Sequence, residues 1–242
     1  KLWHHLEMAP ETLAIVQRHK QHMRNTYKDD SYLFKIVQYL PYVQTAFLVK
    51  WAYKEMLMPV NELVCSAAAY GGYLRTLQWL RKQEEVCPWT DRIFYSENVC
   101  NSAALGGHLH VIQWLRSYDP QCPWDENTCG YAAKNGHVHI IQWARAQDPP
   151  CPWDAETCNA AAHNGNFRLL KWLREQKPRC IWNAGVCIEA AKNNHMDILQ
   201  WTRDQEPKFK SNKDVSAAAA YGGHLNVLKW LRAQDPPCPW NA

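Results

Sequence analysis

Long apolar runs, catalytic motifs and a strong excess of one charge are all missing from this sequence. No window approaches the roughly 18 uncharged apolar residues that a membrane-spanning helix needs, so we expect no membrane insertion. The 242 residues carry a net charge of only +4, which is unlike a surface that follows a phosphate backbone. No nucleophile–base pair, phosphate loop or acid pair stands apart from the overall pattern. We therefore expect no enzyme, no cofactor and no small-molecule substrate.

What is present is an internal repeat. One set of tryptophans recurs in steps of 35, 29, 29, 29 and 29 residues, at Trp79, Trp114, Trp143, Trp172, Trp201 and Trp230. A Gly/Asn pair keeps the same interval, from Gly71-Gly72 to Gly222-Gly223. The longer first step reflects an insertion that contains Ile93, Phe94 and Tyr95. A fixed period of this length is typical of a repeat array.

The ten cysteines fall into two columns of this repeat. The first column is Cys65, Cys100, Cys129, Cys158 and Cys187, and the second is Cys87, Cys122, Cys151, Cys180 and Cys238. Ser216 completes the first column and Phe209 interrupts the second. Because phenylalanine can neither bind zinc nor form a disulfide, we interpret the cysteines as small buried apolar side chains with reduced thiols. We therefore expect no metal site, and an intracellular protein of the cytoplasm or nucleus.

One repeat, residues 149–177, predicts a pair of helices. Prolines keep its start non-helical, and Asp154 suits the N-cap of a first helix at 155–163. Asn164-Gly165 ends that helix, and apolar residues at helical spacing predict a second helix at 167–176. The N-cap position is filled elsewhere by Asn61, Ser96, Asp125, Asn183 and Asn212. Since one pair cannot bury its apolar face alone, we expect an all-α fold, an α-solenoid of stacked helical hairpins.

The repeat cores resemble those of ankyrin repeats. They read AALGGH at 103–108, AAKNGH at 132–137 and AAYGGH at 219–224, and runs such as VIQWL follow them. The resemblance covers residues 59–242, as six repeats and the start of a seventh. The 29-residue period is shorter than the usual 33, and TPLH is replaced by TCGY or TCNA, so we expect shortened β-hairpin fingers, with loops alone as the alternative. The CPWD and RAQDPP segments resemble divergent ankyrin arrays of algae, protists and giant viruses.

Residues 1–58 do not follow the repeat. Their apolar helical runs predict a helical cap that shields the first repeat. The segment IVQYLP followed by AFLVKWAYK also resembles an F-box. That alternative implies a substrate receptor that docks on a ubiquitin-ligase adaptor.

Two further columns contain charged or polar side chains. One consists of Arg81, Arg116, Arg145, Arg174, Arg203 and Arg232. We interpret these arginines as structural, at helix C-termini and mostly with an acid three residues on, rather than as phosphate ligands. The other contains His108, His137, His195 and His224, which we expect to form hydrogen bonds between repeats.

Positions that differ between repeats are the candidates for binding. Immediately before the Gly/Asn pair stand Tyr70, Leu105, Lys134, His163, Lys192 and Tyr221, which we call the inner row. Three residues earlier, a second row includes Ser102, Tyr131 and Glu189. The ankyrin resemblance implies that first helices line a concave face, where these residues would form an aromatic and charged groove. The inserted Ile93, Phe94 and Tyr95 are a second candidate surface.

These patterns predict a protein–protein interaction scaffold whose concave face binds a protein partner. The F-box-type receptor is the alternative, and nucleic-acid binding through the arginine column is a less favoured one.

Overall fold

The computed structural model of the protein describes residues 62–83, 98–205, 212–234 and 238–239. They fall into two compact parts, residues 1–99 and 100–242. Within the described ranges every regular element is an α-helix, which confirms the all-α class. The expected cap or F-box-like segment (1–58) and the inserted Ile93, Phe94 and Tyr95 lie outside the described residues.

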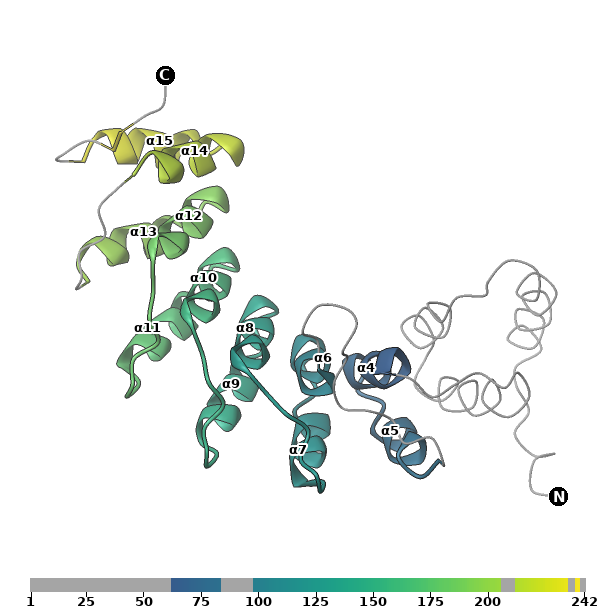
Figure 1. Cartoon of the computed structure of the whole chain (residues 1–242). Helices are drawn as coiled ribbons and strands as arrows, with labels where there is room; N and C mark the ends of the chain where they lie inside the picture. The colour runs from purple at the N-terminus through teal and green to yellow at the C-terminus, as the bar shows by residue number, and fades with distance from the viewer. Residues whose placement is uncertain (1–61, 84–97, 206–211, 235–237, 240–242) are drawn as a thin grey trace, which may run out of the picture. The chain divides into compact units, whose positions relative to one another are not determined.

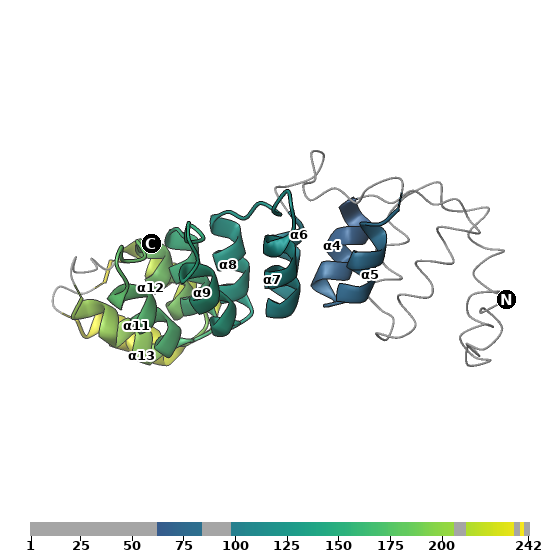
Figure 2. The same ribbon diagram turned by 90° about the horizontal axis from the view of Figure 1, so that it is seen from below.

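The described helices come in pairs, one pair per repeat (Figures 1 and 2). The N-terminal part contains repeat 1, with α4 (Glu62–Tyr70) and α5 (Leu74–Leu80). Repeats 2 to 6 then follow, as α6 (Val99–Gly106) and α7 (Leu109–Ser117), α8 (Glu126–Lys134) and α9 (Val138–Arg145), α10 (Ala155–His163) and α11 (Phe167–Glu175), α12 (Ala184–Lys192) and α13 (Met196–Arg203), and α14 (Lys213–Tyr221) and α15 (Leu225–Arg232).

The starts of α8, α10, α12 and α14 agree with the predicted caps, whereas the predicted caps Asn61 and Ser96 lie outside the described residues. In repeat 4 the Asp154 carboxylate accepts hydrogen bonds from the backbone N–H groups of Glu156 and Thr157, at 3.0 and 3.4 Å. Asp125, Asn183 and Asn212 cap α8, α12 and α14 in the same way. These side chains satisfy amides that have no partner inside the helix, and so they set where each first helix begins.

The connectors between repeats are loops. Residues 118–125, 146–154 and 176–183 contain turns and irregular backbone but no strand. Of the two expectations, shortened β-hairpin fingers or loops alone, these three connectors have loops alone.

The core has two layers of side chains. The second helices of repeats 1 to 5 bury a stripe of consecutive and fourth-neighbour positions, such as Leu169, Leu170 and Leu173 in α11. The first helices of repeats 1 to 5 bury a pair of alanines, such as Ala161 and Ala162 in α10, whereas α14 buries Ala219 alone of its pair. Because these residues are small, neighbouring first helices approach closely, and α8, α10, α12 and α14 pack in succession.

Hydrogen bonds from histidine rings join successive repeats. Nε2 of His195 lies 3.0 Å from the carbonyl oxygen of His163, and Nε2 of His224 lies 2.9 Å from that of Lys192. His137 makes the equivalent bond to the carbonyl of Leu105. Each acceptor is at the C-terminal end of the preceding first helix, where carbonyls lack intrahelical partners. His137, His195 and His224 therefore have the predicted role of linking repeats.

Repeat 4 has Asn166 where repeats 2, 3, 5 and 6 have histidine and repeat 1 has Tyr73. Here the Asn164 amide makes the inter-repeat bonds, to the carbonyls of Ala133 and Lys134. The replacement of histidine by Asn166 also changes how much space surrounds the glycine in the turn of the preceding repeat. A Cβ at Gly165 would meet the His195 ring at 2.5 Å, whereas a Cβ at Gly136, which faces repeat 4, would meet nothing within 4 Å.

We expect Gly165→Ala to destabilise the protein more than Gly136→Ala. Both glycines have positive φ, 65° and 74°, so each alanine costs about 1 kcal/mol in backbone strain. Gly165→Ala also displaces the His195 ring and should cost about 1 kcal/mol more, the value of one hydrogen bond. Urea unfolding followed by circular dichroism measures both free energies.

The control is the same pair of substitutions in a His195→Ala background. Without the ring, the two alanines should cost the same. An equal cost in the presence of His195 would contradict the role of the ring.

Candidate functional site

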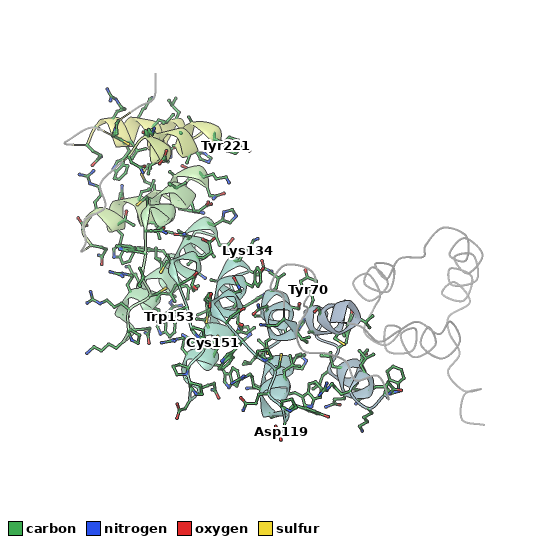
Figure 3. All side chains as sticks on the ribbon, viewed as in Figure 1. Tyr70, Asp119, Lys134, Cys151, Trp153 and Tyr221 are labelled. Atoms are coloured by element: carbon green, nitrogen blue, oxygen red, sulfur yellow. The ribbon has the colours of Figure 1, made fainter. Side chains whose placement is uncertain are left out.

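The candidate site is the inner row, at the C-terminal ends of the first helices. In the C-terminal part these helices lie on the inner side of the curve that the pairs follow, and Lys134 and Tyr221 project from it (Figures 1 and 3). Lys134 and His163 are exposed, Leu105 and Lys192 are half-buried, and Tyr221 is 83% exposed. The structure thus places five of the six predicted residues along one side of repeats 2 to 6. Tyr70, 37% exposed, belongs to the N-terminal part.

The second row contributes less surface than the sequence predicts. Ser102 is buried at 7% exposure, so its inclusion as a contact residue is wrong. The reason is its place one residue before the buried alanine pair of α6. Tyr131 and Glu189 are half-buried and remain candidates.

Neighbouring repeats are joined along the inner row by side chains as well as by backbone. Nδ1 of His163 lies 2.8 Å from a carboxylate oxygen of Glu189, one repeat further on. The Asn193 amide lies 3.2 Å from the same ring nitrogen. The ammonium group of Lys192 is 5.7 Å from the centre of the Tyr221 ring. These contacts hold one side chain against the next in repeats 4 to 6.

The asparagines of the Gly/Asn pair form hydrogen bonds that the sequence reasoning did not predict. Besides Asn164, the Asn135 amide donates to the carbonyl of Leu105 at 2.7 Å, and Asn193 to that of Glu189 at 2.9 Å. The sequence does contain a signal for these bonds, which is the residue type at the first position of the pair. Repeats 3 to 5 have asparagine at the first position of the pair, where repeats 1, 2 and 6 have glycine.

A shallow hollow lies beside the inner row, between repeats 3 and 4. It has a volume of about 570 Å³ and is lined by Lys134, Asn135, Gly136, Asn164, Gly165 and Asn166. Its lining is polar backbone and amide groups with one ammonium group, which suits an extended peptide segment better than an apolar ligand.

The arginine column has a different structural role from the one predicted. The guanidinium groups of Arg116, Arg145 and Arg174 donate to the carbonyls of Cys122, Cys151 and Cys180, at 2.8, 2.6 and 2.9 Å. Each cysteine belongs to the connector that follows the arginine's own helix. The partners that the sequence suggested, acids three residues on, are therefore not what fixes these arginines. They hold the connectors in place.

The same guanidinium groups lie over the tryptophans of the connectors. The distances from the guanidinium carbon to the ring centre are 4.0 Å for Arg116 and Trp124, and 3.9 Å for Arg145 and Trp153. The Trp153 ring also contacts Trp172 of the next helix pair. The two rings meet edge to face, with their centres 6.2 Å apart. An arginine in this position is engaged on both its edge and its face, so it is poorly placed to bind phosphate.

The cysteines are buried, as predicted, but they are not all reduced. Eight of the nine described cysteines are free and buried. Cys65 is disulfide-bonded, so the prediction of a free thiol is wrong at this position. Among the described residues no group of three or more His, Cys, Asp or Glu side chains is placed to hold a metal ion. No described helix combines the length and apolar character needed to cross a membrane.

Comparison of the chain with protein-family models and with curated proteins finds no match.

We expect Arg145→Lys to lower the free energy of unfolding by about 1 to 2 kcal/mol. Lysine keeps the charge but cannot both donate to the Cys151 carbonyl and lie flat on Trp153. Arg168→Lys, on the exposed surface of α11, is the matched control and should change stability by less than about 0.5 kcal/mol. Urea unfolding followed by tryptophan fluorescence compares them, and equal effects would contradict the connector role.

We expect stability to fall as the pH decreases from about 7.5 to 5.5, in part through His137. Burial lowers the pKa of this imidazole below its ordinary value of 6.5, and His139 acts in the same direction against the hydrogen bond to Leu105. The unfolded chain therefore binds the proton first, so the stabilisation present above pH 6.5 is lost at lower pH. His137→Asn, which copies Asn166 of the next repeat, should reduce this dependence.

The urea midpoint measured across this range provides the test. His139→Asn removes one of the two causes that lower the pKa of His137, so the urea midpoint of this variant should depend on pH to an intermediate degree. If the midpoint of His137→Asn depends on pH as strongly as that of the unchanged protein, His137 is not the group responsible.

Proposed function

We propose that this protein is a protein–protein interaction scaffold that binds a partner through the inner row and the adjoining hollow. In this proposal it catalyses no reaction of its own and acts inside the cell. The ankyrin resemblance of the repeat cores implies the same face for the partner.

The observation that carries the proposal is the contrast between backbone and side chain along the inner row. The carbonyls of Leu105, Lys134, His163 and Lys192 all accept hydrogen bonds from the next repeat. Their side chains, in contrast, vary in chemistry and are exposed or half-buried. A row of different side chains on a fixed backbone is preorganised, so a partner would bind with a small cost of ordering.

The chemistry of the row suggests the kind of partner. Lys134 and Lys192 supply positive charge, and Tyr131 and Tyr221 supply aromatic surface. Glu189, the acidic residue of the second row, is already engaged with His163. This combination fits a protein segment that presents carboxylates beside apolar side chains.

The alternatives have less support. Nucleic-acid binding through the arginine column requires free guanidinium groups, whereas Arg116, Arg145 and Arg174 contact connector carbonyls and tryptophans. The F-box-type receptor depends on residues 1–58, which lie outside the described residues, and stays a prediction.

Photo-crosslinking from two exposed positions tests the proposal. A benzophenone amino acid replaces Tyr221 on the inner row or Ile181, 72% exposed, on a connector. In a lysate of the native organism, we expect one protein partner to be crosslinked reproducibly from position 221 and not from position 181. Crosslinks from Ile181 alone would overturn the inner-row assignment.

A matched pair of charge reversals then measures binding of that partner. Lys134→Glu lies on the inner row, and Lys171→Glu lies on the exposed surface of second helix α11. We expect Lys134→Glu to weaken binding about tenfold or more and Lys171→Glu to leave it unchanged. Equal affinities for both variants would contradict the proposal.

A further inference from the structure

The two cysteine columns together provide one pair of positions in each repeat. In each repeat the connector position lies 22 residues after the first-helix position, as in Cys100 and Cys122, Cys129 and Cys151, and Cys158 and Cys180. Repeat 5 has Cys187 with Phe209, and repeat 6 has Ser216 with Cys238, so each has lost one sulfur.

Contacts in the C-terminal part show that the two positions of a pair meet. In repeat 6 the Ser216 hydroxyl oxygen lies 2.9 Å from the Cys238 sulfur, and both are buried. In the same register, the Cys129 side chain is hydrogen-bonded to Cys151, and that of Cys158 to Cys180. Cys187, which has no cysteine partner in its repeat, lies 3.3 Å from the Thr202 hydroxyl instead.

The connector thiol is held in place by its surroundings. The thiol of Cys151 donates to the carbonyl of Asp125 at 3.4 Å, and that of Cys180 to the carbonyl of Asp154 at 3.1 Å. Both carbonyls belong to N-cap residues of the first helix of the same repeat. The arginine that donates to the carbonyl of the connector cysteine fixes its backbone from the other side. Two sulfurs are thus kept together in a dry, rigid site.

We propose that Cys129 with Cys151, and Cys158 with Cys180, are sites of reversible disulfide formation, one within each repeat. The oxidant is a small-molecule disulfide such as oxidised glutathione. One thiolate attacks it and releases one glutathione thiol, and the second cysteine then attacks the mixed disulfide and releases the other. Each repeat loses two protons and two electrons, and one external disulfide is reduced to two thiols. Cys65, the first-helix cysteine of repeat 1, is already disulfide-bonded.

Burial makes the exchange slow in the closed repeat. Both sulfurs of a pair are shielded from solvent, and the hydrogen bond with Cys151, together with burial, raises the pKa of Cys129 far above its ordinary value. The attacking thiolate is therefore scarce until the connector opens. Oxidation should accelerate in urea below the unfolding transition.

The first experiment maps the disulfides in the full chain. The protein is incubated with oxidised glutathione in sub-denaturing urea, its free thiols are alkylated, and its peptides are identified by mass spectrometry. We expect linked peptides for Cys129–Cys151 and Cys158–Cys180, with Cys187 and Cys238 alkylated. Linkage of Cys187 or Cys238 at a similar yield, or no linkage at all, would overturn the proposal.

The second experiment creates a new pair. Ser216→Cys places a second sulfur against Cys238, whereas Ala217→Cys, at an exposed neighbouring position, is the matched control. After oxidation, we expect Cys238 to be protected from alkylation in Ser216→Cys and to be freed by a reductant. Protection that is equal in both variants, or absent from both, would show that the register does not direct the bond. This readout does not depend on a binding partner, so it is separate from the test of the scaffold.

Discussion

The arrangement of repeats 2 to 6 depends on one hydrogen bond that repeats 2 to 5 each receive from the next repeat. A helix ends with carbonyls that have no partner within it, and buried carbonyls without partners are costly. Here the carbonyls of Leu105, His163 and Lys192 are satisfied by imidazoles of the following repeat. A single repeat therefore lacks a hydrogen-bond donor that only the following repeat supplies. Apolar burial alone would hold the pairs together, but it would set their register less strictly.

Because of this bond, the contact between repeats uses the backbone of the inner row and leaves its side chains free to vary. Because the donor acts on the backbone, it makes no demand on the side chain of the residue it contacts. Leucine, lysine and histidine therefore follow one another along the inner row without weakening the contact between repeats. The position is structurally constant and chemically variable, which is the combination a recognition surface requires.

Local signals were enough to predict the helices. The cap at Asp154, the helix stop at Asn164-Gly165 and the apolar spacing predict helices at 155–163 and 167–176, and the structure has Ala155–His163 and Phe167–Glu175. Features that depend on backbone acceptors could not be read in this way, because a carbonyl has no sequence signature. Arg145 was therefore paired with an acid, although its acceptor is the carbonyl of Cys151. Ser102 was assigned to the surface because its repeat position varies, yet it is buried, directly before the buried alanine pair of α6.

The cysteines show why columns must be compared with one another as well as along the chain. Taken separately, Phe209 and Ser216 make each column look like a set of interchangeable small or apolar residues. Taken as pairs, each exception is matched by a change in the contact of the remaining sulfur. Cys238 meets the hydroxyl of Ser216, and Cys187 meets that of Thr202. A purely apolar role would not require a polar partner each time a sulfur is missing, so a polar contact for the remaining sulfur, within the pair in repeat 6 and with Thr202 in repeat 5, is what the two repeats share.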